Sequence, residues 1–130
     1  MEYGYKRQVT LTYEEAVRRT REELQKEGFG IMTEIDVKDT LKKKLDVDFD
    51  NYIILGACNP SFAYQSLLAE KDIGLLMPCN VIVYQSGGRT FVAAVRPTVA
   101  MSRVDNNQLA GLAVQVEAKL KKAVDGVTSA

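Results

Sequence analysis

The two cysteines of the chain stand in similar settings. Cys58 ends an apolar run, and Cys79 stands just after a proline at the edge of another. Each is followed directly by an asparagine, Asn59 or Asn80. A thiol beside an amide can bind a ligand, react as a nucleophile or simply pack in a core. These two Cys-Asn pairs are therefore the first candidates for a functional site.

Each residue of these pairs has a functional and a structural interpretation. Cys58 precedes Asn59 and Pro60, a favoured N-cap and a favoured first helical residue. The positive end of such a helix would favour the Cys58 thiolate, whereas a small buried hydrophobe is the structural alternative, and capping alone explains Asn59. No helix follows Asn80, so its amide either closes a bulge near Pro78 or faces a ligand.

A third candidate is Glu34, near the end of a predicted strand. The strand pattern places Phe29, Ile31, Thr33 and Ile35 on one face and Glu34 on the other. If helices also cover that second face, Glu34 is a buried carboxylate of the kind that gathers at functional sites. If the face is open, Glu34 is an ordinary solvent-exposed residue.

Other familiar chemistries are absent from the sequence. The chain has no histidine, which excludes Ser-His-Asp and Cys-His catalysis. A zinc site is not expected, because two thiolates with Glu34 and Asp36 would be an unusual ligand set. The sequence contains neither a dinucleotide fingerprint nor a phosphate-binding P-loop. We therefore predict no metal and no cofactor. Cys58, Cys79 and Glu34 remain candidate catalytic residues if the chain is an enzyme.

Composition limits the classes of partner and the compartment. The chain has 130 residues, which predicts a single domain over residues 1–130 with a frayed C-terminus. Lys+Arg and Asp+Glu number 17 each, so no excess of positive charge favours nucleic acid or a membrane surface. Neither a signal peptide nor a membrane-spanning run is evident. These features predict a cytoplasmic protein with reduced thiols.

Hydrophobic periodicity predicts alternating strands and helices. Strands are expected over residues 3–11, 29–35, 52–58 and 89–96, and one bent strand or two short ones over 73–84. Helices are expected after the capping box at Thr12, after Asp36 with a buried stripe of Val37, Leu41 and Leu45, after Asn59, and near the C-terminus, ending at Asp125-Gly126. The order predicts an α+β fold with repeated β-α-β units, an antiparallel or mixed sheet, and helices mainly on one face.

Three sequence blocks carry a family resemblance. They are residues 28–37 (GFGIMTEIDV), 55–60 (LGACNP) and 78–81 (PCNV), and together they resemble the signature blocks of the domain of unknown function 302 family. The resemblance implies a bacterial or archaeal α+β domain that forms a homodimer, without an established reaction. Arg96 departs from the pattern, which has an acidic residue before Pro97.

Three functional hypotheses follow. The first, which we favour, is a homodimeric module that binds a small molecule in a polar pocket. The pocket would be formed by Glu34, Cys58, Asn59, Cys79 and Asn80. The second is a thiol-dependent enzyme or redox sensor using Cys58 or Cys79. The third is a structural or interaction domain in which the Cys-Asn pairs serve only the fold.

Overall fold

A computed structural model describes residues 1–128 of the chain. The strands are β1 (Gly4–Val9), β2 (Gly30–Asp36), β3 (Tyr52–Cys58), β4 (Cys79–Ser86) and β5 (Arg89–Val95). The helices are α1 (Tyr13–Lys26), α2 (Val37–Leu45), α3 (Pro60–Ala69), the 3₁₀-helix η1 (Lys71–Leu76), α4 (Pro97–Ala100) and α5 (Asn107–Thr128).

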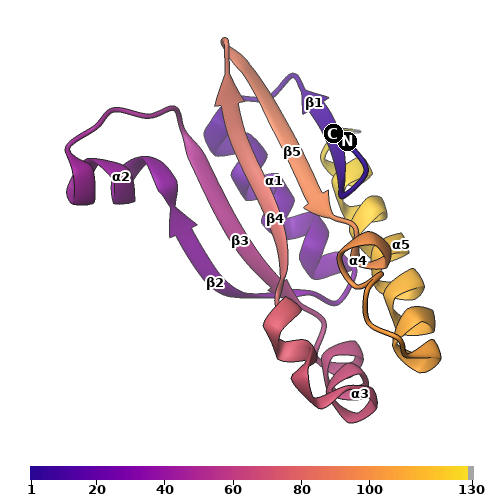
Figure 1. Ribbon diagram of the computed structural model, residues 1–130. Helices are drawn as coiled ribbons and strands as arrows, with labels where there is room; N and C mark the ends of the chain where they lie inside the picture. Colours follow the sequence, from indigo (N-terminus) through magenta and orange to yellow (C-terminus); the bar gives the residue numbers. More distant parts are fainter. Residues whose placement is uncertain (129–130) are drawn as a thin grey trace.

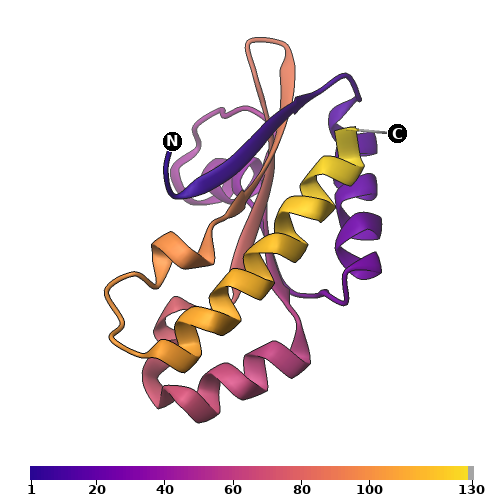
Figure 2. The same cartoon turned by 90° about the vertical axis from the view of Figure 1, so that its right-hand side faces the viewer.

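The strands form one antiparallel sheet in the order β1-β5-β4-β3-β2. Helices α1 and α5 cover one face of this sheet, and the other face has no helical layer of this kind (Figures 1 and 2). The core lies between the sheet and these two helices; its members include Leu24, Leu55, Val81, Val83, Val92, Leu120 and Val124. The predicted α+β class, with helices mainly on one face, is confirmed.

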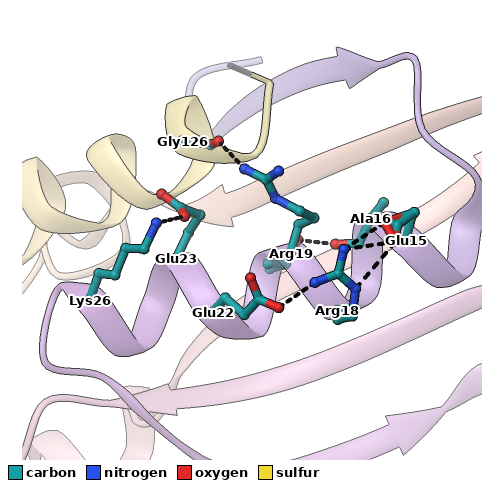
Figure 3. A network of polar contacts seen from close by, with 9 residues as sticks. Glu15, Ala16, Arg18, Arg19, Glu22, Glu23, Lys26 and Gly126 are labelled. Carbon is teal, nitrogen blue, oxygen red and sulfur yellow. Dashed lines mark hydrogen bonds and ion pairs between the residues drawn. The ribbon is translucent and has the colours of Figure 1, made fainter. Parts of the chain in front are cut away.

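Local hydrogen bonds close both ends of α1. The Glu15 amide donates to Thr12 Oγ1 over 3.1 Å, which is the N-cap bond. At the other end Gly28 adopts a φ of +86°, and the Phe29 amide donates to the Leu24 carbonyl over 3.0 Å. This is the Schellman arrangement that favours glycine. The second half of the capping box does not form, because the Glu15 carboxylate accepts from Arg18 instead (Figure 3).

Helix α5 extends past the predicted stop at Asp125-Gly126 and continues to Thr128 within the described residues. A Cβ at position 126 would lie 1.9 Å from Glu23 Oε1 on α1, and the Arg19 guanidinium donates to the Gly126 carbonyl over 3.1 Å (Figure 3). Gly126 therefore serves the close approach of two helices. Residues 129–130, part of the predicted frayed end, lie outside the described residues.

A β-bulge in β2 changes the predicted alternation. The register with β3 shifts between Ile31 and Thr33. Ile31 consequently faces the helices and packs on the core, whereas Thr33 and Ile35 point to the opposite face. Glu34 therefore shares the helix side of the sheet with Ile31, and the prediction that they occupy opposite faces was wrong.

The segment before β4 also differs from the prediction. Residues 73–76 belong to η1 and not to a strand, and β4 begins at Cys79, directly after Pro78. A proline offers no amide to a sheet ladder, which explains why pairing starts after it. The turn between β4 and β5 is formed by Gly87 and Gly88, whose φ values are +57° and +75°.

Helix α2 has no buried residue, contrary to the predicted buried stripe. Val37 and Leu41 are half-buried, and Leu45 is 66% exposed. Its N-cap is as predicted, since the Asp39 amide donates to Asp36 Oδ1 over 2.9 Å. The helix projects from the β2 edge on the side of the sheet opposite α1 and α5 (Figures 1 and 2).

Candidate functional site

Three of the five predicted site residues line one pocket, which we call the sulfur pocket. Cys58 ends β3, Cys79 begins β4, and the β3–β4 register pairs Ala57 with Cys79. The pocket lies where these strands meet α3 and α5, and its volume is about 40 Å³. Its lining is mostly apolar and comprises Phe29, Ala57, Cys58, Asn59, Phe62, Ala63, Ser66, Met77, Pro78, Cys79, Pro97, Met101, Leu112, Ala113 and Val116.

Asn59 occupies the N-cap position of α3, but its side chain does not cap the helix. Its Nδ2 instead donates to the Glu27 carbonyl over 3.2 Å. That carbonyl stands at the C-terminal end of α1, where carbonyl oxygens lack intrahelical partners. Asn59 therefore ties α1 to the start of α3, and the interpretation that capping alone explains it was wrong.

Burial keeps Cys79 in its neutral form. Burial, with a smaller contribution from the neighbouring Cys58, raises the pKa of the Cys79 thiol to about 11. The thiol is therefore protonated at neutral pH, and the thiolate is the nucleophilic form. This arrangement disfavours Cys79 as an activated nucleophile. It also shows that the two sulfur atoms are electrostatic neighbours.

Asn80 faces away from the sulfur pocket. It pairs with Gly56 of β3 and lies on the sheet face opposite α1 and α5, which we call the open face. A hollow of about 560 Å³ lies there, the open-face hollow, lined by Met1, Tyr3, Gly4, Lys6, Tyr52, Asn80, Ile82, Tyr84, Ala93, Ala94 and Val95. Asn80 is exposed, and its side-chain amide makes no hydrogen bond within the described part of the chain.

Aromatic rings cross the open face from strand to strand. The rings of Tyr52 and Tyr84 stack at 5.2 Å, and those of Tyr84 and Phe91 at 5.2 Å. Burial, Tyr84 and Tyr3 together raise the pKa of Tyr52, so three tyrosine hydroxyls lie near one another. The Lys6 ammonium donates to the Tyr84 hydroxyl over 3.3 Å. One cationic group therefore stands beside an aromatic wall.

Glu34 belongs to neither hollow. Its Oε1 lies 2.8 Å from Arg21 of α1, in an ion pair that is partly exposed. Tyr13 is a further neighbour, and burial together with Asp36, Glu14 and Glu34 raises its pKa to about 12. The structure thus places Cys58, Asn59 and Cys79 together, Asn80 in the open-face hollow on the other side of the sheet, and Glu34 on the edge strand β2.

A comparison with protein families gives one match over nearly the whole chain. The family described as domain of unknown function DUF302 matches residues 5–127. The chain belongs to this family. A solved structure, an uncharacterized conserved DUF302 protein from Bacillus stearothermophilus, is 29% identical, with a TM-score of 0.91. The match covers 97% of this chain and 98% of that one. No curated protein matches the chain.

Arg96, where this DUF302 chain departs from the expected acidic residue, reaches a buried carboxylate that sequence analysis missed. Arg96 Nε lies 3.2 Å from Glu117 Oε2 of α5. Glu117 is 6% exposed and accepts from the Thr98 amide and hydroxyl over 3.1 and 2.6 Å. Burial raises its pKa, but the bonds from Thr98, Arg96 and Lys121 outweigh burial and leave it lowered. Glu117 stands four residues after Ala113, on the buried side of α5. This spacing could have predicted its burial from the sequence.

The described residues contain no cluster of three or more cysteine, aspartate or glutamate side chains suited to a metal. None of their helices is long and apolar enough to cross a bilayer.

Proposed function

We propose that the chain is a small-molecule-binding module whose ligand occupies the open-face hollow. The observation that carries the proposal is a hollow of ligand size whose wall includes the side-chain amide of Asn80, which makes no hydrogen bond within the described residues. The hollow has a volume of about 560 Å³, within the range of roughly 300–1,000 Å³ typical of ligand sites. The Asn80 amide at its wall is not used by the fold. Cys58, Asn59 and Cys79 line the smaller sulfur pocket, which shares no lining residue with this hollow.

The lining indicates the class of ligand. Tyrosine rings and the side chains of Ile82 and Ala93 offer apolar and aromatic contacts, which favour a flat apolar body. Lys6 supplies a cation, and Asn80 supplies both donors and an acceptor. A small aromatic carboxylate satisfies all of these groups at once, and we propose it as the ligand class.

A thermal-shift experiment tests this proposal. Benzoate, phenylacetate and indole acetate are titrated against the full chain, with the corresponding neutral amides as controls. A carboxylate at 100 times its Kd should stabilise the protein by about 2.7 kcal/mol, seen as a higher Tm. Asn80→Ala should abolish the shift, because it removes the free amide, and Lys6→Gln should reduce it. Asn107→Ala, at an exposed asparagine outside the hollow, is the matched control and should keep the full shift.

Two results would contradict the proposal. One is the absence of any shift across the panel at millimolar concentrations. The other is a shift that Asn80→Ala and Lys6→Gln leave unchanged while both variants retain the parent's unliganded Tm, since binding would then occur elsewhere.

A second candidate function is self-association, and the segment formed by α2 and residues 46–49, the α2 arm, favours it. Leu45, Val47 and Phe49 are 66%, 43% and 45% exposed. A nine-residue helix is marginal in water without tertiary packing, and α2 has no buried residue and packs mainly against the neighbouring strands β2 and β3. We propose that a second copy of the chain covers the apolar side of this arm in a symmetric dimer.

A further inference from the structure

Four sulfur-bearing side chains converge on the sulfur pocket from separate segments. Cys58 ends β3, Met77 and Cys79 flank Pro78, and Met101 follows α4. The chain has two cysteines and four methionines, so four of its six sulfur side chains line this one pocket. Such a concentration exceeds what an apolar core requires, since leucine or valine would fill the same space.

The remaining lining offers little else to a ligand. The Asn59 amide already donates to the Glu27 carbonyl, and the Ser66 hydroxyl donates to the Phe62 carbonyl over 2.7 Å. The other lining side chains are apolar. The sulfur atoms are therefore the donor groups that this otherwise apolar pocket offers to a ligand. The volume of about 40 Å³ accepts an ion and is well below the roughly 300 Å³ of a metabolite site.

We propose that the sulfur pocket binds a single Cu(I) ion through Cys58, Cys79, Met77 and Met101. Thiolate and thioether sulfurs are soft ligands, which suit the soft Cu(I) ion. Zinc instead takes thiolate, imidazole or carboxylate ligands, usually four of them. This pocket offers two thiols, and the chain has no histidine.

The ion has a route to the sulfurs. A second hollow of about 190 Å³ adjoins the pocket, and Met77, Cys79 and Met101 line both. These three side chains therefore stand between the outer hollow and Cys58. Each coordinating thiol gives its proton to water and forms a copper–sulfur bond. Copper remains Cu(I) throughout, so no electron is transferred.

An anaerobic titration of the reduced full chain tests the site. Cu(I) is delivered in competition with the chromophoric chelator bicinchoninate, and native mass spectrometry counts the ions bound. We expect one ion per chain. The double variant Cys58→Ser/Cys79→Ser should lose it. Met77→Leu and Met101→Leu should each weaken binding by roughly tenfold or more, since loss of even an outer-shell partner costs about 10–100-fold.

The control variant is Met32→Leu. Met32 is 67% exposed at the β2 bulge, so its replacement should leave the Cu(I) affinity unchanged. Met→Leu nearly conserves volume, so the pocket variants should fold and keep the parent's thermal unfolding. The proposal is overturned if the double cysteine variant still binds one ion with parental affinity. It is also overturned if folded Met77→Leu and Met101→Leu match Met32→Leu, or if Zn²⁺ binds more tightly than Cu(I).

Discussion

The two asparagines that follow the cysteines show how far residue type determines a role. Both stand after a cysteine, yet the Asn59 side chain donates to the Glu27 carbonyl, while the Asn80 side-chain amide makes no hydrogen bond within the described residues. The helix start at Pro60 was readable, because the Asn-Pro pair is a strong local signal. The hydrogen bond from Asn59 to the Glu27 carbonyl could not be predicted from local sequence, because the two residues are 32 positions apart.

Glu117 gives a prediction at this scale. The folded state lowers the pKa of the Glu117 carboxyl below its value in the unfolded chain. Glu117 therefore stabilises the fold at pH values above the unfolded-state pKa, and this stabilisation is lost as the pH falls through the folded-state pKa. Glu117→Gln should therefore destabilise the protein by about 1–3 kcal/mol at pH 7. It should also reduce the loss of stability on acidification, because the lowered pKa of the Glu117 carboxyl no longer contributes. Urea unfolding between pH 3 and 7 measures both effects.

The control for this prediction is Glu14→Gln. Glu14 is an exposed residue in the first turn of α1, away from the Thr98 bonds. Its replacement should change stability by only a few tenths of a kcal/mol. If Glu117→Gln shows the same acid dependence as the parent, Glu117 is not a linked group and its place in the account is wrong.

Among the elements, strand β2 shows what periodicity does not reveal. The alternation from Phe29 to Ile35 is regular, and it predicted one apolar face. The bulge between Ile31 and Thr33 inserts one residue and exchanges the faces that follow. No residue type within β2 predicts this bulge. On the partner strand, Gly56 leaves the space that the Thr33 side chain and the Pro78 ring occupy.

Gly56 gives the prediction for this element. A Cβ there would lie 2.0 Å from Thr33 Oγ1 and 2.7 Å from Pro78 Cγ. Gly56→Ala should therefore destabilise the protein by about 1–3 kcal/mol through overpacking. Thr33→Ala added to it should recover only part of the loss, because the rigid Pro78 ring remains. Chemical denaturation of the two single variants and the double variant gives the interaction energy.

Gly74→Ala is the comparison for this series. Nothing lies within 4 Å of a Cβ at position 74, and no positive φ occurs there. A Gly56→Ala variant as stable as Gly74→Ala would contradict the close packing of Gly56 against Thr33 and Pro78.

For the whole molecule, the sequence predicts the order of elements, but it predicts only part of the grouping of site residues. The two Cys-Asn pairs do not form one site, because Cys79 and Asn80 are neighbours on a strand and point to opposite faces of the sheet. The bulge carried Glu34 to the Arg21 side. Met77 and Met101 went unnoticed as site residues, because methionine at apolar spacing looks like core.

Self-association is the prediction at this scale. Leu45→Glu places a charge on the apolar side of the α2 arm, and burying an unpaired charge is costly. The parent chain should therefore have a dimeric mass at micromolar concentration in light scattering, and Leu45→Glu should be a monomer. Val114→Glu, at a position 59% exposed on α5, should remain a dimer. A monomeric parent chain, or a Leu45→Glu variant that stays dimeric, would contradict this prediction.

The most direct test of the central claim is an amide NMR titration with phenylacetate, which maps the bound probe on the sheet. The account predicts that the largest saturable shift changes fall on Asn80, Ile82, Tyr84 and Ala93, and that Asn80→Ala removes them. Changes centred on Phe62 and Leu112 at the sulfur pocket, with Asn80 and its neighbours unmoved, would contradict a ligand site on the open face.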